Sequence, residues 1–426
     1  MKKRNAFTLI ELLAVIVILA VILVIAIPRI LDVIETSKKD SFKNAAQLIA
    51  DSAEKKKVSD KLLGKDESIT CKDVAKINDE DYASCKISFD SDGIAKVSIT
   101  GKGKFDGLAI IDGTKMSSDV IELELPEYGL MKTYIENLYN DEVLRNVNNL
   151  KKDNTVDENI RYYGSDPNNY VSFNNELWRI IGVFGSNVKL IRNESLGKLS
   201  WDSSESSINE GEGVNEWSTS ALKNYLNKMY YGGDTTVTCY GGTKNSIKTC
   251  PTNTLVEVAK SLIDNHTWKT GAIEYNTRTD TLAFYSAERG TVNGKICTSG
   301  DYCNDTVERT TEWPGYIGLP YATDYAYASG ESICETNMVK QDSNNVYICK
   351  NDNWMFKPNT WYWTMSPLAY SGSSRFVWLV SSDGSVGSNV AACGGAVFPT
   401  IYLKSNILIE SGTGTSSDPY ILKAGS

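Results

Sequence analysis

The sequence predicts an α+β protein with a long N-terminal helix, a small head built on an antiparallel sheet, and a larger α+β domain. Three observations support this fold class. An apolar run at 7–27 leads into an amphipathic pattern, and short apolar segments separated by turn residues continue to residue 125. From about residue 160 onward, Tyr, Trp, Asn, Ser and Gly become more frequent, which is typical of strands joined by turns.

The composition narrows the classes of function. The chain has 426 residues and a formal net charge of -9. At roughly 100–200 residues per domain, this length predicts two to four folded units. The negative charge disfavours nonspecific binding to nucleic acid, because phosphate contacts need Lys and Arg. The single histidine, His266, argues against a multi-histidine metal site, and we predict neither a metal nor another cofactor.

The first element is the apolar run 7–27, which is long enough to cross a bilayer as a helix. Basic residues 2–4 precede it, which predicts a cytoplasmic N-terminal end and export of everything after Pro28. A secretory signal would have a shorter apolar core, followed by a small-residue cleavage site. Glu11 is the one charge in the run, and a carboxylate there costs roughly 2.5–3.5 kcal/mol unless it has a partner.

Residues 6–13, AFTLIELL, resemble the cleavage and methylation motif of type IV prepilins and pseudopilins. Pro28 lies where such pilins carry a helix-kinking proline. The resemblance implies that residues 1–6 are a leader, that a prepilin peptidase cuts between Ala6 and Phe7, and that the new amine of Phe7 is methylated. The family usually has Gly before the cut, whereas this chain has Ala6.

The same resemblance supplies a partner for Glu11. The positive amine of Phe7 would lie in an apolar bundle, where Glu11 of a neighbouring subunit neutralises it and sets the register between subunits. Phe7, Glu11 and Pro28 are therefore the predicted assembly residues of a helical filament with non-closing contacts. The implied partners are other pilin subunits, the prepilin peptidase and, before assembly, the inner membrane.

The next elements are predicted from pattern. The amphipathic stripe extends the helix over 7–60, and residues 61–125 predict a β head with strands at 86–89, 94–99 and 108–111. Asp90-Ser91-Asp92-Gly93 is expected to be a turn and not a calcium site, because the EF-hand spacing and its distal Glu are missing. Residues 126–159 predict a polar helical linker.

Residues 160–426 predict the larger domain. A hairpin is expected over 170–184, a strand over 188–192, a helix over 217–230 with Ser218 or Ser220 as its N-cap, and a β-rich segment over 361–402.

About residues 160–410 resemble C-type-lectin-like domains of bacterial and phage surface proteins, including the variable proteins of diversity-generating retroelements and relatives of the formylglycine-generating enzyme. The resemblance is carried by 176–182 (ELWRIIG), Trp217, 363–367 (WTMSP) and 397–403 (VFPTIYL). It implies a display domain with a ligand-binding surface. The family ending usually has Gly and Arg where this chain has Ala396 and Phe398.

The segment 367–403 has a composition that fits a diversified surface. Retroelement systems change adenines, often in AAC codons, which never yields Lys, Glu, Gln, Met or Trp. The segment contains none of the first four and only one Trp. A Gly- and Ser-rich β region would have the same composition, so both interpretations stay open. The candidate ligand-binding residues are Tyr370, Ser373, Arg375, Phe376, Trp378, Ser381, Asp383, Ser385, Ser388, Asn389, Ala391, Ala392, Cys393 and Phe398.

The nine cysteines predict disulfides, because export places them where disulfides persist. Sequence neighbours form four local pairs: Cys71 with Cys85, Cys239 with Cys250, Cys297 with Cys303, and Cys334 with Cys349. Eight cysteines allow 105 pairings, and locality favours this one. Cys393 is left over as a free thiol, an intermolecular bridge or a nucleophile, and a zinc site is disfavoured because no CxxC occurs.

Together these features predict a type IV pilus subunit, in a minor or tip position, that recognises an unknown protein or glycan ligand as a surface adhesin. It would lie in the cytoplasmic membrane before assembly and in an extracellular pilus at the cell surface afterwards. Two alternatives remain: a structural pseudopilin of a secretion or DNA-uptake machine, and an exported enzyme on a fold like that of the formylglycine-generating enzyme. Nothing basic lies near Cys393 in 391–395, so we predict no enzymatic activity.

Overall fold

A computed structural model describes residues 9–64, 69–75, 81–203, 211–242, 246–274, 280–292, 295–296, 310–336, 349–369 and 374–425. Side chains are described within these ranges except at 9–28, 31, 83, 274, 291–292 and 295–296. Internal contacts divide the chain into two compact units, unit 1 over Met1–Glu124 and unit 2 over Leu125–Ser426. Each unit is described by itself.

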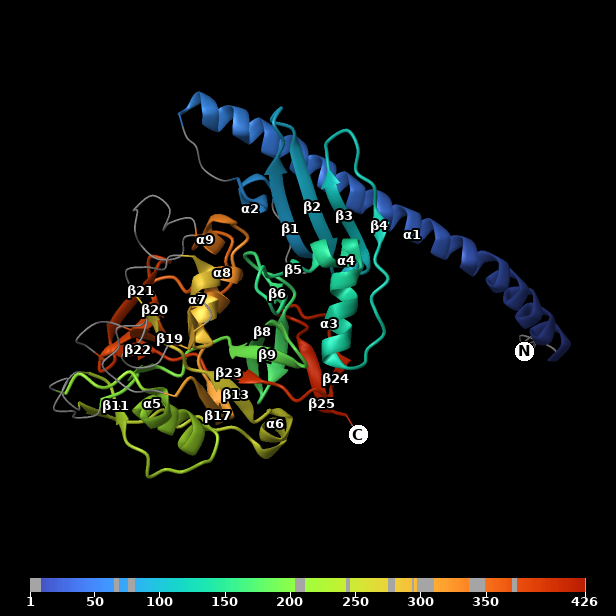
Figure 1. The fold of residues 1–426 in the computed structure, drawn as a ribbon. Helices are drawn as coiled ribbons and strands as arrows, with labels where there is room; N and C mark the ends of the chain where they lie inside the picture. Colours follow the sequence, from blue (N-terminus) through green and yellow to red (C-terminus); the bar gives the residue numbers. More distant parts are fainter. Residues whose placement is uncertain are drawn as a thin grey trace, which may run out of the picture. The chain divides into compact units, whose positions relative to one another are not determined.

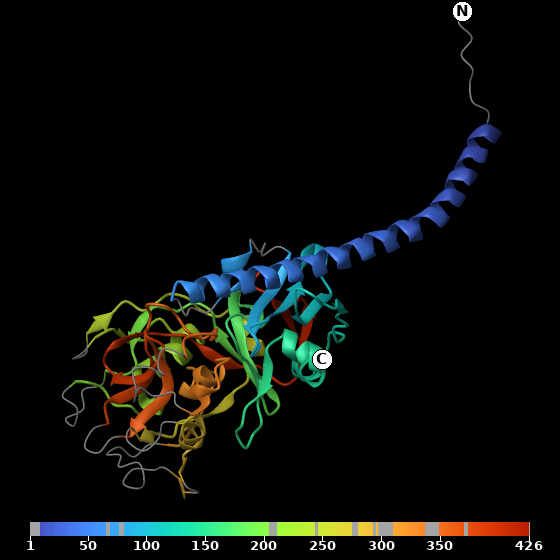
Figure 2. The same ribbon diagram turned by 90° about the horizontal axis from the view of Figure 1, so that it is seen from above.

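Unit 1 is organised by one long helix, α1 (Leu9–Leu62), which confirms the predicted helix over its described part and ends at Leu62 rather than at residue 60. The C-terminal part of α1 lies against a sheet, and its N-terminal part extends past that sheet (Figures 1 and 2). Among residues whose side chains are described, no helix is apolar over a length that would cross a membrane. The side chains of the run 7–27 lie outside that set.

The sheet of unit 1 is four-stranded and antiparallel, in the order β1-β2-β3-β4. Its strands are β1 (Tyr82–Phe89), β2 (Ala95–Gly101), β3 (Leu108–Gly113) and β4 (Ile121–Glu122). The helical turns α2 (Cys71–Val74) and η1 (Gly103–Phe105) accompany it. The predicted turn after β1 is confirmed, because the Oδ1 of Asp90 accepts hydrogen bonds from the backbone of Asp92 and Ile94.

The core of unit 1 forms where α1 meets this sheet. Phe42, Ala46 and Ile49 recur at helical spacing and are buried against Val97 and Ile110 of the sheet. The amphipathic stripe in the sequence therefore covers the predicted β head.

Residues 126–159, predicted as a linker, fold into unit 2. They form α3 (Met131–Asn140), α4 (Glu142–Val147) and β5 (Leu150–Lys152). Tyr134 of α3 is buried against Tyr420, with ring centroids 5.8 Å apart. The helical spacing that suggested a polar linker instead buries an apolar face, and the division of the chain lies near residue 124.

The larger sheet of unit 2 has nine strands, with the path β18-β23-β9-β8-β7-β25-β24, β6 added on β8 and β5 on β6. The strands beyond β5 are β6 (Ile160–Tyr162), β7 (Tyr170–Phe173), β8 (Glu176–Phe184), β9 (Asn187–Arg192), β18 (Ile317–Gly318), β23 (Thr400–Tyr402), β24 (Ile407–Ser411) and β25 (Tyr420–Ala424). The C-terminal strand β25 pairs in parallel with β7.

The predicted hairpin at 170–184 is confirmed as β7 and β8. Asn174 and Asn175 connect the strands with φ angles of 58° and 57°, in the left-handed region that a two-residue hairpin turn requires and that Asn tolerates. Within β8, Gly182 lets β6 approach, because a Cβ there would lie 2.1 Å from the carbonyl oxygen of Ile160.

The second sheet of unit 2 has six strands, with the path β10-β22-β19-β20-β21 and β14 beside β19. The strands are β10 (Lys198–Ser200), β14 (Ile273–Glu274), β19 (Tyr362–Ala369), β20 (Phe376–Val380), β21 (Val386–Val390) and β22 (Gly394–Ala396). Three small ribbons complete the strands: β11 (Cys239–Tyr240) with β12 (Ile247–Lys248), β13 (His266–Lys269) with β17 (Glu312–Gly315), and β15 (Thr291–Val292) with β16 (Lys295–Ile296).

The predicted helix at 217–230 consists of η2 (Trp217–Thr219), α5 (Ala221–Asn224) and the π-helical segment η3 (Tyr225–Tyr230), with Ser220 capping α5. The remaining helices are α6 (Glu257–Leu262), α7 (Thr281–Glu288), α8 (Ala322–Tyr327) and α9 (Ile333–Thr336). Phe284 of α7 and Tyr325 of α8 are buried in one core with Ile191 of the large sheet and Trp378 of the smaller sheet. Helices and sheets in both units confirm the α+β class.

Candidate functional site

The predicted processing and assembly residues cannot be placed as side chains. Ala6 and Phe7 lie outside the described residues, and the side chains of Glu11 and Pro28 lie outside the set described. The backbone at Glu11 and Pro28 is helical, as part of α1.

Three predicted disulfides are present in the structure. Cys71 bonds Cys85 in unit 1, while Cys239 bonds Cys250 and Cys334 bonds Cys349 in unit 2. The predicted pair of Cys297 and Cys303 lies outside the described residues. Cys393 is free and half-buried.

The candidate ligand-binding residues fall into three groups. Tyr370 and Ser373 lie outside the described residues. The side chains of five others are buried, which corrects their assignment to a binding surface: Trp378, Ser385, Ala391, Ala392 and Phe398. The half-buried members, which reach the surface in part, are Arg375, Phe376, Ser381, Asp383, Ser388, Asn389 and Cys393.

Packing explains the correction. The indole of Trp378 is fully buried on β20, and its Nε1 donates a hydrogen bond to the carbonyl oxygen of Ile273. The amino-acid composition of a segment says which residue types it contains. Whether each of them is buried depends on which elements cover the strand. Both faces of β20 are largely covered, so composition alone could not separate its core residues from its surface ones.

A cavity of about 530 Å³ lies in unit 2. The end of β10, the helical segment 217–230 and the ribbon β11–β12 form its walls, and its polar lining residues include Ser203, Asn224, Lys228, Asp234, Thr236 and Tyr240. The disulfide of Cys239 and Cys250 holds one wall. A rigid wall with several hydroxyl groups suits hydrogen bonding to a polar ligand.

Two carboxylates, Asp202 and Asp234, and one ammonium group, Lys228, line the cavity. The Oδ1 of Asp234 accepts hydrogen bonds from the backbone N (2.9 Å) and the hydroxyl (2.6 Å) of Thr236, which lower the pKa of Asp234 and keep it ionised. Lys228 contributes a positive charge. With Asp202 and Asp234 against Lys228, acidic side chains outnumber basic ones in the lining, and hydroxyl and amide groups lie among them.

The segment 391–394 of the candidate binding region packs against the chain that forms the cavity wall. The backbone N of Asp202, a cavity residue, donates to the carbonyl oxygen of Ala391 at 3.1 Å. A Cβ at Gly394 would lie 2.9 Å from the carbonyl oxygen of Gly241, which follows Tyr240 of the lining. The backbone of the predicted segment therefore contacts the chain that forms the cavity wall, but no residue of the segment is among the lining residues.

The half-buried residues near this segment include an ion pair and a thiol. Arg375 pairs with Glu212, whose carbonyl oxygen accepts from the backbone N of Ala392. Burial, reinforced by the charge of Glu212, raises the pKa of the Cys393 thiol. A protonated thiol is a poor nucleophile.

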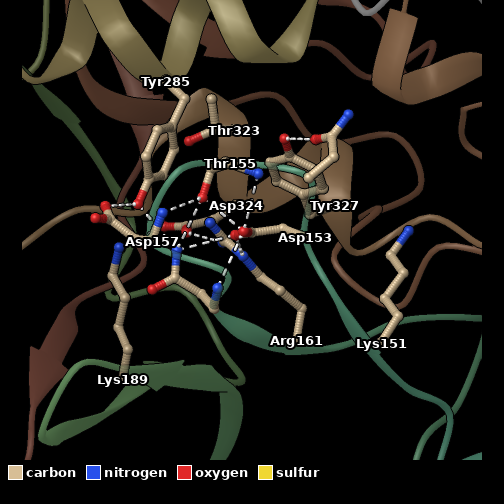
Figure 3. Close-up of polar contacts among 12 residues, drawn as sticks. Lys151, Asp153, Thr155, Asp157, Arg161, Lys189, Tyr285, Thr323, Asp324 and Tyr327 are labelled. Atoms are coloured by element: carbon tan, nitrogen blue, oxygen red, sulfur yellow. Dashed lines mark hydrogen bonds and ion pairs between the residues drawn. The ribbon is translucent and has the colours of Figure 1, made fainter.

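A cluster of buried charges lies deeper in unit 2 (Figure 3). The guanidinium of Arg161 on β6 bonds two carboxylates, with Nε 2.8 Å from Asp153 and Nη1 2.7 Å from Asp324 on α8. The ammonium of Lys189 on β9 lies 2.5 Å from the second oxygen of Asp324. All four side chains are at most 1% exposed.

Each charge of this cluster is set by its partners. Burial alone would raise the pKa of Asp153 and Asp324, but the cations outweigh it and lower both values: Arg161 acts on Asp153, and Lys189 with Arg161 on Asp324. Burial lowers the pKa of Lys189 to about 8. These side chains join β6, β9 and α8, so the cluster fixes the large sheet to the helical layer.

Neither the cavity nor the cluster of buried charges was predicted from the sequence, although the sequence contains a signal for each. Lys189 interrupts the apolar run 188–191, and a charge at the centre of an apolar strand indicates a buried partner. The cavity loop 234–238 is polar and lies between a Gly pair and Cys239. Among the described residues, no group of His, Cys, Asp and Glu side chains is placed to hold a metal ion.

Comparison with known proteins bears on the N-terminus. Residues 1–27 match the family model described as the prokaryotic N-terminal methylation motif. The motif indicates a protein of the type IV pilin or pseudopilin kind, with a membrane-associated precursor, processing by a prepilin peptidase and assembly with other pilin subunits at the surface. No curated protein and no solved structure matches the chain.

Proposed function

We propose that the protein is a minor or tip subunit of a type IV pilus, and that unit 2 recognises a ligand outside the cell. The methylation motif at residues 1–27 carries the proposal, because it assigns the first helix to filament assembly. Unit 2 spans Leu125–Ser426, far more chain than the head of unit 1. So large a domain on every subunit would crowd a shaft, which favours a rare or terminal position.

The ligand site of this proposal is the cavity, together with the half-buried surface around Arg375, Asn389 and Cys393. Three features support it: the charged groups of Lys228, Asp202 and Asp234, the hydroxyl groups of the lining, and the wall held by the disulfide of Cys239. Ligands with many hydroxyl groups can form hydrogen bonds with such a lining, so a glycan is the first ligand class to test. The lectin-like assignment of residues 160–426 belongs to this proposal.

Binding of the purified full-length protein to an array of bacterial and host glycans tests the ligand site. Lys228→Ala combined with Tyr240→Ala removes a charge and a ring from the cavity, and we expect at least about tenfold weaker binding to any glycan that binds. Lys404→Ala, at an exposed position outside the cavity lining, is the matched control and should bind like the unmodified protein.

Equal binding by the cavity variant and the control would contradict the cavity as the site. Absence of binding to glycans and to cell surfaces, with the protein abundant along the filament shaft, would contradict the recognition function itself.

A further inference from the structure

Lys189 and Asp324 meet inside unit 2. Lys189 lies on β9 and Asp324 in the first turn of α8, 135 residues apart in sequence. The Nζ of Lys189 is 2.5 Å from Oδ2 of Asp324, and the two side chains are 0% and 1% exposed. An amine and a carboxyl group are therefore in contact with almost no access to solvent.

Aromatic rings enclose the amine. The Nζ of Lys189 lies 4.3 Å from the ring centroid of Tyr321, and 5.3 Å from those of Phe184 and Tyr402. Rings at these distances displace water that would otherwise solvate the ammonium. A buried charge is unfavourable compared with the same charge in water, so a reaction that removes both charges is favoured here.

Two further groups adjoin the pair. Nη1 of Arg161 donates to Oδ1 of Asp324 at 2.7 Å, so this oxygen is held by a cation in the way that an oxyanion is stabilised. Glu288 on α7 is fully buried, and its Oε2 accepts from the hydroxyl of Thr323, the neighbour of Asp324, at 2.7 Å. Burial raises the pKa of Glu288 to about 7, so its carboxyl group can both accept and release a proton near neutral pH.

We propose that Lys189 and Asp324 condense into an isopeptide bond once unit 2 has folded. The Nζ of Lys189 forms a bond to Cγ of Asp324, and the bond from Cγ to Oδ2 breaks. The ammonium gives up two protons, with Glu288 as the proton carrier, and both leave with Oδ2 as one water molecule. Oδ1 remains as the amide oxygen beside Arg161, and no oxidant or other reactant is consumed.

The charge balance of the cluster supports the condensation. The reaction removes one buried cation and one buried anion, and it leaves Arg161 paired with Asp153 at 2.8 Å. The new bond joins the large sheet to the helical layer across 135 residues. A covalent link across so long a stretch restricts the unfolded chain, as a disulfide does, and resists extension when the domain is pulled.

Peptide mass spectrometry of the purified full-length protein tests the bond, independently of how the N-terminus is processed. Trypsin should fail to cut after a linked Lys189. After reduction and alkylation, we expect residues 180–192 joined to residues 310–340, with a mass one water below the sum of the two peptides. The free peptide 180–189 should be absent.

Substitutions test which side chains form the isopeptide bond. Lys189→Arg keeps the positive charge but lacks the amine, and Asp324→Ala lacks the carboxyl group, so neither should contain the linked peptide. Lys357→Arg is the matched control: Lys357 is a half-buried lysine whose Nζ donates to the carbonyl oxygen of Asn193, which cannot condense, and this variant should link fully. Glu288→Gln should link at least about tenfold more slowly, because the proton carrier is missing.

The proposal would be overturned if the folded wild-type protein had its full mass, with no loss of water, and released the free peptide 180–189 on digestion. If Glu288→Gln formed the isopeptide bond as fast as the wild-type protein, the role of Glu288 as proton carrier would be overturned. Neither result depends on ligand binding or on pilus assembly, so failure here is distinguishable from failure of the proposed function.

Discussion

Arg161 balances two buried carboxylates, and its role can be separated from that of an ordinary surface ion pair. Its contacts with Asp153 and Asp324 are almost fully excluded from solvent. Arg192, by comparison, pairs with Glu176 at a position that is 10% exposed, against a partner that is 19% exposed. The two arginines therefore form a matched pair for measuring what burial adds to an ion pair.

In the Lys189→Arg variant, where Asp324 keeps its carboxylate, replacing Arg161 with Met should lower the free energy of unfolding of unit 2 by about 3–5 kcal/mol, because two carboxylates would lose the cation they share. Arg192→Met should lower it by no more than about 1–2 kcal/mol, since its partner keeps contact with water. Urea denaturation of both variants measures the difference. Equal losses would show that the buried cluster does not depend on its charge balance.

Glu288 predicts a pH dependence of stability. Burial raises its pKa from 4.5 to about 7 in the folded protein, whereas the unfolded carboxyl group ionises near 4.5. The stability gained from the protonated group is therefore complete below about pH 4.5 and is lost as the pH rises through about 7.

The Lys189→Arg variant cannot form the isopeptide bond, so in that background the difference in unfolding free energy between the protein with Glu288 and the protein with Glu288→Gln isolates this effect, because Gln does not titrate and other groups cancel. We expect the difference to shift against the protein with Glu288 by on the order of 3 kcal/mol between pH 4.5 and pH 8. Denaturant titrations at several pH values supply the measurement. A difference that does not change with pH would show that Glu288 is ionised in the folded protein.

At the scale of elements, the disulfides act within their own units. The bond from Cys71 to Cys85 joins α2 to β1, with 14 residues of separation. Cys239 and Cys250 close a loop of similar length, with a separation of 11, in unit 2. Each disulfide serves as the control for the other, because the first should stabilise only unit 1 and the second only unit 2.

Replacing Cys71 and Cys85 with Ala should destabilise unit 1 by about 2–4 kcal/mol, because the unfolded segment gains conformational freedom. Hydrogen exchange should become faster in β1 and β2 and stay unchanged in unit 2. The double Ala variant of Cys239 and Cys250 should give the opposite distribution. Faster exchange in both units from either variant would contradict independent stabilisation.

Gly182 gives a second prediction for an element. A Cβ at this position would lie 2.1 Å from the carbonyl oxygen of Ile160, so Gly182→Ala should separate β6 from β8 and destabilise unit 2 by about 1–3 kcal/mol or more. Gly129→Ala has no atom within 4 Å of its Cβ and should be nearly neutral. Thermal denaturation compares the two, and equal midpoints would contradict the close approach of these strands.

Local sequence patterns predicted individual helices, strands and turns better than they predicted how these elements pack together. The Asn174-Asn175 hairpin, the turn at Asp90 and the stripe on α1 are encoded by residues near one another, so the sequence indicates them. The parallel pairing of β25 with β7 joins strands far apart in the chain, and no local period specifies it. Residues 126–159 were predicted as a linker although they fold into unit 2, because the spacing on α3 identifies an apolar face but not the unit that covers it.

The same reasoning explains the candidate site. The cysteine pairs were readable because short loops close most easily. The buried cluster draws Asp153, Lys189 and Asp324 from three separate segments, and the burial of Trp378 depends on both layers around β20. Such contacts depend on the assembled fold, which is why composition could not separate the core residues of the segment from its surface residues.

For the molecule as a whole, we propose that a filament helix carries a recognition domain. In this proposal the N-terminal motif serves assembly, and the cavity and disulfide-closed loops of unit 2 bind a ligand at the surface. The helix would then need processing before assembly, whereas unit 2 would need only to fold outside the cell.

The most direct test of the central claim is mass spectrometry of the N-terminal peptide of this protein in pili sheared from cells. We predict a mature chain that begins at Phe7 with a methylated amine, in the same fraction as other pilin subunits. Detection in that fraction at low abundance would fit the minor or tip position. A chain that retains residues 1–6, or that is missing from sheared pili while present in cell membranes, would contradict the assignment to a type IV pilus.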